Sequence, residues 1–342
     1  MNRSDIRFAI PSNGRLEKDA LTFMDACGLP VKRRNPRQYT ATIRGLPGVT
    51  ALWQRQNDIV RGIRQGSLDF AIVGLDALSE RCPTNQPELC ENILVLHDEL
   101  GISHCELHLA VPSQWGDVNT LADLKEKAKV LDPLRIATKF PNLTQQFMLE
   151  NGIEPFETVK ADGTLEIAPA IDFADIIVDL VSTGTTLKAN ALKQVDDGML
   201  IHSQGVLVAS KQALKDRPEV LETARILLEY FAAYLRAKDS YTVTANVRGD
   251  SPEAVSAMML HKENIRGLQG PTISKVVPHQ LTKEADNQWY AINIIVRRDA
   301  LSDAIRELRE IGGSGVIVTE VRYIFEEEPV RYRAMLEALN LR

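Results

Sequence analysis

Short apolar runs alternate with helix-like stretches along most of this 342-residue chain. Runs such as Arg7–Ile10 and Asp69–Val73 have the length of buried strands. Between them, apolar residues recur at helical spacing, as from Leu16 to Cys27, and Gly28 ends that pattern. Strands separated by helices favour a mostly parallel sheet with helices on both faces, so we predict an α/β fold.

The order of the expected elements changes after about residue 240. A long amphipathic helix is expected over residues 217–237, and strands and helices then follow in the order β-α-β-β-α-β. That order is typical of a ferredoxin-like domain. We therefore predict a separate small domain over residues 238–325 and a charged helical tail over residues 326–342.

Charge and composition limit the classes of function. Lys and Arg number 40 against 46 Asp and Glu, and the net charge of −6 argues against a nucleic-acid binder while allowing a local basic pocket. No apolar stretch reaches the length of a membrane span, and the N-terminal apolar run is too short for a signal peptide. We therefore expect a cytoplasmic protein without a membrane partner. Its cysteines, which form no CxxC pair, are expected to be reduced thiols: Cys27, Cys82, Cys90 and Cys105.

The segment Asp175–Asn190, with the sequence DIIVDLVSTGTTLKAN, carries the strongest chemical signal. Its apolar run leads into a set of small residues: Ser182, Thr183, Gly184, Thr185 and Thr186. A glycine lets the backbone approach an anion, and hydroxyl and N–H groups before the following helix can donate to it. The pattern indicates a phosphate-binding loop; an ordinary strand–turn–helix with a Ser or Thr cap is the alternative.

Two carboxylates precede this loop, and they would repel a phosphate. Asp175 and Asp179 instead suit the hydroxyl groups of a ribose, or a hydrated Mg²⁺. A sugar beside a phosphate is the pattern of a ribose 5-phosphate. We therefore predict a phosphosugar site.

The same run closely resembles the phosphoribosyl-diphosphate (PRPP) loop of the ATP phosphoribosyltransferase family. Further blocks resemble that family in the same order: IPSNGRL at residues 10–16, RQNDI at 55–59, Gly66, Asp69, Gly74 and Asp76, LRIATKFP at 134–141, GTLE at 163–166 with Ala168 and Pro169, and GPTI at 270–273. The resemblance covers about residues 5–325, and the loop is its most specific part.

This resemblance implies a core of two α/β lobes like that of a type II periplasmic binding protein. The first lobe would hold residues 1–98 and 192–237, and the second would hold residues 99–191 with the PRPP loop. Residues 238–325 would form a regulatory domain that binds histidine as an inhibitor, with Thr272 and Ser274 as candidate contacts. A homo-oligomer, dimer or hexamer, and the use of Mg²⁺ are also implied.

The implied reaction is attack by adenine N1 of ATP on C1 of PRPP, which expels pyrophosphate. Both substrates are polyanions, so orientation and charge neutralisation should supply most of the rate acceleration. No nucleophilic side chain is needed, which agrees with the lack of a Ser/His/Asp or Cys/His motif in the sequence. The 6 histidines also show no metal-ligand spacing.

We assign expected roles on that basis. The PRPP 5-phosphate would contact Ser182, Thr183, Gly184, Thr185 and Thr186, with Glu166 as a further substrate contact. ATP or the diphosphate would contact Gly14, Arg15, Arg55, Asp76 and Lys139. Asp175, Asp179 and Arg15 are the candidate catalytic residues, and the two aspartates would hold Mg²⁺ indirectly, through substrate or water.

Simpler explanations exist for several of these residues. Arg15 could begin a solvated helix, and Asp76 could shape a turn. Arg55 could pair with Asp58 on a surface helix. For the whole protein, the alternatives are a non-enzymatic two-lobe solute-binding or sensor protein, and a phosphoribosyltransferase with another base acceptor.

Overall fold

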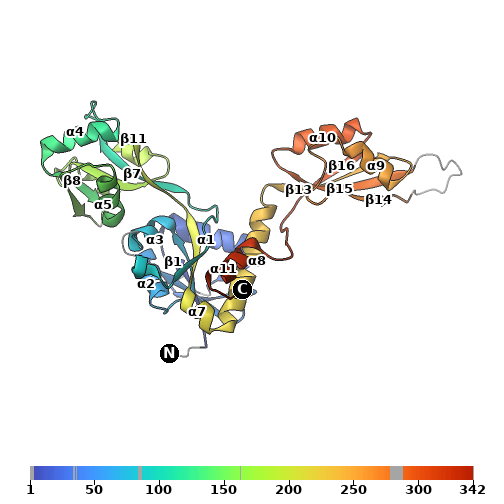
Figure 1. Ribbon diagram of the computed structural model, residues 1–342, viewed down its shortest axis with the longest axis horizontal. Helices are drawn as coiled ribbons and strands as arrows, with labels where there is room; N and C mark the ends of the chain where they lie inside the picture. Colours follow the sequence, from blue (N-terminus) through green and yellow to red (C-terminus); the bar gives the residue numbers. More distant parts are fainter. Residues whose placement is uncertain are drawn as a thin grey trace. The chain divides into compact units, whose positions relative to one another are not determined.

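A computed structural model of the protein describes residues 4–33, 35, 37–83, 87–161, 163–277 and 288–341. The chain divides into two compact units, one formed by Met1–Leu228 with Val330–Arg342 and the other by Glu229–Pro329. Two α/β lobes make up the first unit, and an antiparallel sheet with helices packed on it makes up the second (Figure 1). The predicted α/β class is confirmed.

The first lobe is built on a seven-stranded sheet with the strand order β2-β3-β4-β1-β5-β12-β6. Its strands are β1 (Ile6–Pro11), β2 (Val31–Lys32), β3 (Thr40–Ile43), β4 (Val49–Gln54), β5 (Phe70–Gly74), β6 (Ile93–His97) and β12 (Gly205–Ser210). Its helices are α1 (Gly14–Ala26), α2 (Gln56–Arg64), α3 (Leu75–Arg81), η1 (Pro87–Cys90), α7 (Lys211–Asp216) and the start of α8 (Pro218–Ala237). The central strands β1 and β5 are buried along almost their whole length, as expected for parallel strands covered on both faces.

The second lobe is built on a five-stranded sheet with the order β11-β7-β10-β8-β9. Its strands are β7 (Cys105–Pro112), β8 (Leu134–Thr138), β9 (Phe156–Lys160), β10 (Ile176–Val181) and β11 (Leu192–Ser203). Its helices are α4 (Leu121–Leu131), α5 (Pro141–Glu150), η2 (Leu165–Ile167) and α6 (Thr185–Ala189). Because β8 and β10 are parallel neighbours, the turns that follow them lie at the same edge of the sheet.

Two chain segments join the lobes. Ser203, at the end of β11, is paired with Cys105 at the start of β7, and residues 98–104 and Gln204 lead to the first lobe. The prediction that the first lobe resumes at residue 192 is wrong. The backbone of β11 is paired with β7 in the second sheet, so the chain returns to the first lobe only after Ser203.

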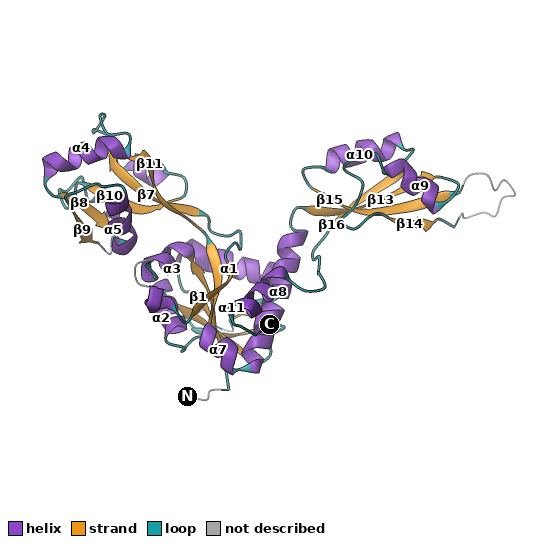
Figure 2. Cartoon of the chain, viewed as in Figure 1, coloured by secondary structure: helices purple, strands orange, loops and turns teal. Residues whose placement is uncertain are grey.

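The second unit confirms the predicted β-α-β-β-α-β order. Its elements are β13 (Ser240–Arg248), α9 (Pro252–Met259), β14 (Thr272–Lys275), β15 (Trp289–Arg297), α10 (Leu301–Glu310) and β16 (Ser314–Glu320). The sheet order β14-β15-β13-β16, all antiparallel, is that of a ferredoxin-like fold. Both helices lie on one face of the sheet and cover its apolar side chains (Figure 2).

The C-terminal helix α11 (Val330–Ala338) belongs to the first unit. It lies against β6 with Met335 and Leu339 buried, and Arg331 forms an ion pair of 2.5 Å with Asp98. The tail predicted to be helical therefore adds a helix to the first lobe. No helix within the described ranges is both long enough and apolar enough to cross a bilayer.

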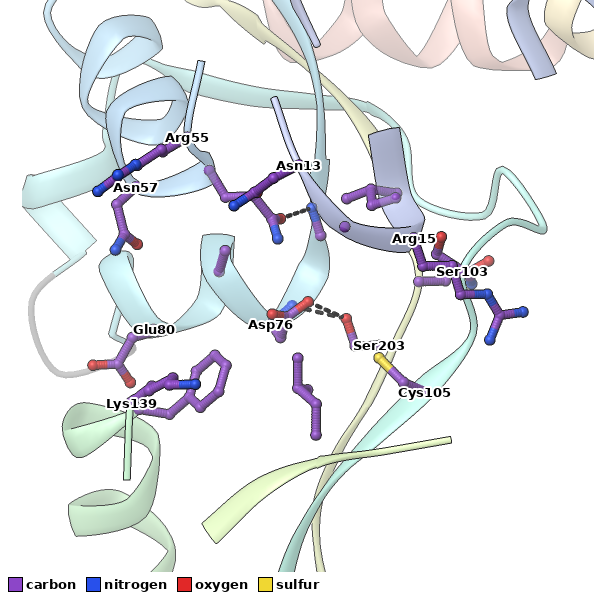
Figure 3. A pocket seen from close by; sticks show the side chains of 18 of the residues that line it. Asn13, Arg15, Arg55, Asn57, Asp76, Glu80, Ser103, Cys105, Lys139 and Ser203 are labelled. Carbon is purple, nitrogen blue, oxygen red and sulfur yellow. Dashed lines mark hydrogen bonds between the residues drawn. The ribbon is translucent and has the colours of Figure 1, made fainter. Parts of the chain in front are cut away.

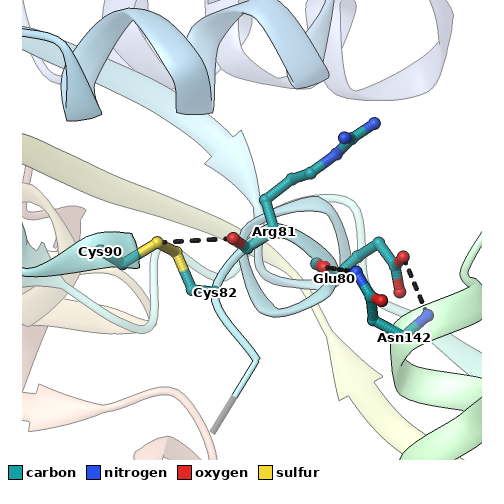
Figure 4. Close-up of a disulfide and its surroundings, with 5 residues drawn as sticks. All are labelled: Glu80, Arg81, Cys82, Cys90 and Asn142. Atoms are coloured by element: carbon teal, nitrogen blue, oxygen red, sulfur yellow. Dashed lines mark hydrogen bonds between the residues drawn. A yellow bond between two sulfur atoms is a disulfide. The ribbon is translucent and has the colours of Figure 1, made fainter. Parts of the chain in front are cut away.

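One expectation about the cysteines is wrong. Cys82 and Cys90 form a disulfide, while Cys27 and Cys105 are free thiols (Figure 4). The sequence shows no motif for this pair. The two Cα atoms lie 5.6 Å apart, a separation that a disulfide can bridge.

Candidate functional site

A cavity of about 580 Å³ lies in the first unit and is lined by both lobes and by the segments that join them. Figure 3 shows its side chains: Arg55 and Asn57 come from α2 and its N-cap, Asp76 and Glu80 from α3, and Lys139 from the second lobe. Several predicted site residues line it: Gly14, Arg15, Arg55, Asp76, Lys139 and Ser182.

Two arginines come from turns that follow parallel strands of the first lobe. Gly14, with a φ of +79° that favours glycine, follows the end of β1 and places Arg15 at the start of α1. The Arg15 Nε lies 3.3 Å from an Asp19 carboxylate oxygen. Arg55 caps α2 and forms no ion pair with any residue that the structure describes. The alternative Arg55–Asp58 pair is not formed, because Asp58 is paired with Arg61.

Asp76 is buried at the start of α3 and is bonded to the second lobe. Ser203 Oγ donates a hydrogen bond of 2.6 Å to Asp76 Oδ1, and the Asp76 N–H donates one of 3.0 Å to Ser203 Oγ. Burial raises the pKa of the Asp76 carboxyl, and the Ser203 hydrogen bond opposes that rise. Gly74 is needed beside it, because a Cβ there would lie 2.4 Å from Asp76 Oδ1.

The loop Ser182–Thr186 leads from β10 into α6, and its hydroxyl and N–H groups are accessible to a ligand. Gly184 has a φ of +69°, the left-handed region that a Cβ disfavours, so the chain can turn here. All four hydroxyl side chains are exposed. The backbone N–H groups of residues 183–186 donate to no residue in the described part of the chain. The Oγ1 atoms of Thr183 and Thr185 lie 3.0 Å apart.

Lys139 and Asp179 lie at the same edge of the second sheet, because they stand near the carboxyl ends of the parallel strands β8 and β10. Burial raises the pKa of the Asp179 carboxyl, the positive charge of Lys139 lowers it, and the negative charge of Glu166 raises it further. Lys139 and Glu166 are therefore close enough to Asp179 to act on its carboxyl group.

Asp175 does not lie there, which corrects its predicted role. It precedes β10, at the end opposite the loop, and its carboxylate accepts hydrogen bonds from the Arg135 backbone N–H at 2.7 Å and from Arg135 Nη2 at 2.8 Å. Four residues of extended chain place Asp175 about 13 Å from Asp179 on the same face of the strand. Asp175 therefore holds β10 to β8, at the end of β10 away from the loop.

Sequence reasoning missed Glu80 and Ser203, which both line the cavity. Glu80 is only 5% exposed, and its carboxylate accepts N–H groups at the start of α5 in the second lobe. The available signal was the spacing of Asp76 and Glu80, four residues apart and therefore on one face of α3. No local pattern marks Ser203, which reaches the site through the pairing of β11.

Thr272 and Ser274 lie on β14 in the second unit. Both side chains are exposed, and the strand pairs with β15 alone among the described strands. Their predicted contact with histidine stays a prediction.

Residues 55–229 match the family model of ATP phosphoribosyltransferase, and residues 237–323 match the model of the HisG C-terminal domain. ATP phosphoribosyltransferase 1, chloroplastic, of Arabidopsis thaliana is 42% identical over 100% of this chain and 82% of its own length. An ATP phosphoribosyltransferase of Rhodopseudomonas palustris (strain HaA2) is 32% identical over 94% of each chain. A chain of the ATP phosphoribosyl transferase (HisG:HisZ) complex from Thermotoga maritima shares the fold, with a TM-score of 0.50 and 24% identity over 66% of this chain and 98% of that one.

The two-lobed α/β core and these relatives define the chain as a pentosyltransferase, an enzyme that transfers a five-carbon sugar. Within that class, the protein belongs to the ATP phosphoribosyltransferase family. The resemblance that its sequence motifs showed is confirmed, as is the two-lobed core with a C-terminal ferredoxin-like domain.

Proposed function

We propose that the protein joins adenine N1 of ATP to C1 of PRPP, giving 1-(5-phosphoribosyl)-ATP and pyrophosphate, in histidine biosynthesis. The observation that supports this most is the arrangement around the cavity. Cationic side chains of the first lobe line the cavity. Ser182, which also lines it, begins a loop with exposed hydroxyls and with N–H groups that meet no acceptor among the described residues.

The loop residues 182–186 would hold the 5-phosphate of PRPP. Their exposed hydroxyls can donate to phosphate oxygens, as can their N–H groups, which meet no acceptor in the part of the chain that the structure describes. Charge-assisted hydrogen bonds of this kind are stronger than neutral ones. Asp179 would accept a hydrogen bond from the ribose, since its carboxylate lies on the strand that leads into the loop. Glu166 stays a further predicted contact on that side.

Arg15, Arg55 and Lys139 would neutralise the diphosphate of PRPP and the triphosphate of ATP. Guanidinium groups bind phosphates bidentately, and Arg55 makes no competing ion pair among the described residues. Gly14 would let the backbone approach the anion. The negative charge of Asp76 suits an adenine amino group or a ribose hydroxyl of ATP better than a phosphate.

The chemical step forms the N1–C1 bond and breaks the bond from C1 to the diphosphate oxygen, which leaves with the electron pair. C1 gains positive charge and the leaving oxygen gains negative charge in the transition state. Preorganised cations near the leaving group, and two substrates held in line, would lower the barrier without a covalent intermediate.

Mg²⁺ is expected to enter with the diphosphate. The described residues contain no group of three or more His, Cys, Asp or Glu side chains that could hold a metal alone. Mg²⁺ usually keeps several waters and takes one or two carboxylates together with substrate phosphates, and Asp179 fits that smaller requirement. Asp175 does not fit, because Arg135 occupies its carboxylate. When bound, Mg²⁺ would offset the negative charge of the diphosphate.

Histidine is proposed to inhibit the enzyme through residues 238–325, with Thr272 and Ser274 as the first contacts to test. A homo-oligomer, dimer or hexamer, and a cytoplasmic location stay predictions. Measuring the reaction rate with and without histidine tests the inhibition, and sedimentation under both conditions tests the oligomer. Unchanged rate and unchanged assembly in histidine would remove the regulatory role and leave the catalytic one intact.

Incubation with ATP, PRPP and Mg²⁺ tests the reaction itself. We expect the altered absorbance of an N1-ribosylated adenine and one pyrophosphate for each product. Tight binding of another solute without turnover would favour a solute-binding or sensor protein. Product formed only with another base would favour a different acceptor.

A further inference from the structure

Glu80 joins the two lobes of the first unit. It stands in the last turn of α3 in the first lobe, yet its partners belong to α5 in the second lobe (Figure 4). Glu80 Oε1 accepts the Asn142 N–H at 3.1 Å and Oε2 accepts the Leu143 N–H at 3.0 Å. The Glu80 carbonyl oxygen also accepts the Asn142 side-chain amide at 2.9 Å. Each of these bonds crosses between the lobes.

The first turn of α5 has N–H groups that its own N-cap residue does not accept, and the Glu80 carboxylate accepts them. The N-cap residue Phe140 makes no side-chain cap hydrogen bond, and Pro141 occupies the first position, where it has no N–H to offer. The next two N–H groups are those that an N-cap side chain normally accepts. Glu80 accepts both, so the cap of this helix comes from the other lobe.

The other end of α3 makes a similar contact. Asp76 is bonded to Ser203 on β11, a strand of the second sheet, and Glu80 lies four residues further along the same helix face. One short helix of the first lobe thus places two buried carboxylates against the second lobe. Burial raises the pKa of both carboxyls, and the Asn142 and Leu143 N–H groups oppose the rise at Glu80.

This contact lies beside the cavity. Lys139 and Phe140, directly before α5, line it together with Asp76 and Glu80. We propose that Glu80 is a positioning residue: by capping α5 from α3, it fixes the spacing between the cationic turns of the first lobe and the Lys139 edge of the second. Its effect on the reaction rests on the proposed function, whereas its effect on α5 does not.

Hydrogen exchange and steady-state kinetics on the full-length protein test this role. In Glu80→Ala, the Asn142 and Leu143 amides should exchange about tenfold faster, the loss expected for a helix cap. The kcat should fall by about the same factor, with smaller changes in the KM values, because the two substrates are misaligned rather than unbound. Glu80→Gln keeps one acceptor oxygen and should give intermediate values in both measurements.

Glu150→Ala is the matched control. Glu150 is an exposed carboxylate at the other end of α5 and is bonded to Gln146 of the same helix. Both measurements should stay at the wild-type values in this variant.

Unchanged exchange at Asn142 and Leu143 in Glu80→Ala would overturn the proposal, as would faster exchange with wild-type kcat. Tighter binding of PRPP or ATP by Glu80→Ala would also overturn it, because Glu80 would then be competing with a substrate anion for α5. A wild-type protein that forms no product would refute the proposed reaction instead. The exchange data, recorded without substrates, would still decide whether Glu80 holds α5.

Discussion

Two turns at the same edge of the second sheet differ in what satisfies their N–H groups. The turn from β8 into α5 has its donors accepted by Glu80 of the other lobe. The turn from β10 into α6 has four exposed hydroxyls, and its N–H groups meet no acceptor in the described part of the chain. Similar strand–helix turns thus differ in whether the protein itself supplies the acceptor for their N–H groups or leaves those groups open to a ligand.

A substitution that distorts the open turn should have the strongest effect on PRPP binding. Gly184→Val puts a β-branched side chain at a φ of +69° and would push the loop out of its present shape. Two or more charge-assisted hydrogen bonds would be lost, so PRPP affinity should fall by about 100-fold. Titration calorimetry with PRPP and with ATP measures this, and ATP affinity should change far less.

Thr185→Ala removes one hydroxyl from the same loop and should cost PRPP affinity about tenfold. Gly116→Val is the control for a valine at an exposed glycine, and it should change neither affinity. Equal losses of PRPP and ATP binding in the loop variants would show that the loop does not select the phosphosugar.

Removing the Cys82–Cys90 disulfide should weaken the contact between Glu80 and the turn from β8 into α5. Cys82 lies two residues after Glu80, and its bond to Cys90 closes a short loop. Loss of that cross-link should lower the free energy of unfolding by about 2–3 kcal/mol. Denaturant unfolding of the Cys82→Ser, Cys90→Ser double variant measures the change. Exchange at Asn142 and Leu143 should rise with it, while PRPP affinity stays constant; a loss of PRPP affinity would contradict the separation of the two turns.

Much of the fold could be predicted because its signals are local. The apolar runs of β1 and β5 and the β-α-β-β-α-β order of the second unit depend on spacing that the sequence shows directly. Gly184 and the hydroxyl residues around it could be identified for the same reason. Periodicity could not show where β11 leaves one sheet for the other, since that depends on its pairing with β7.

The missed contacts join segments that lie far apart in the chain. Arg135 and Asp175 are 40 residues apart, and Glu80 and Asn142 are 62 apart. A carboxylate before a strand looks the same in the sequence whether it meets a sugar or an arginine. The sequence therefore predicts a ribose contact for Asp175, whereas the parallel register of β8 and β10 brings Arg135 beside it.

Asp175 and Asp179 allow a comparison of the two ends of β10. Asp175→Asn removes the charge that Arg135 meets, so the melting temperature should fall by a few degrees while PRPP affinity is unchanged. Asp179→Asn should instead lower turnover by about tenfold, with little change in melting temperature. Thermal unfolding and steady-state kinetics on both variants measure these effects. If Asp175→Asn lowered turnover and Asp179→Asn lowered only the melting temperature, Asp175 would be the residue that contacts the substrate.

A pH effect on stability should arise in the first lobe, away from both turns. His97 is buried in β6, and desolvation, followed by the nearby Arg331 charge, lowers its pKa to about 4. Between pH 6.5 and 4, His97 is therefore protonated in the unfolded chain but neutral in the folded protein. The free energy of unfolding should be highest above pH 6.5 and should fall as the pH drops toward 4. His97→Gln should flatten this part of the stability curve.

The loop at residues 182–186 can be tested most directly by amide NMR of the full-length protein titrated with PRPP. We expect the amide resonances of residues 183–186 to shift and to become protected from exchange as PRPP binds. Those of Asn142 and Leu143 should already be protected without it and should change little. Unchanged amides at 183–186 in a protein that binds PRPP would contradict the assignment of this loop to the 5-phosphate.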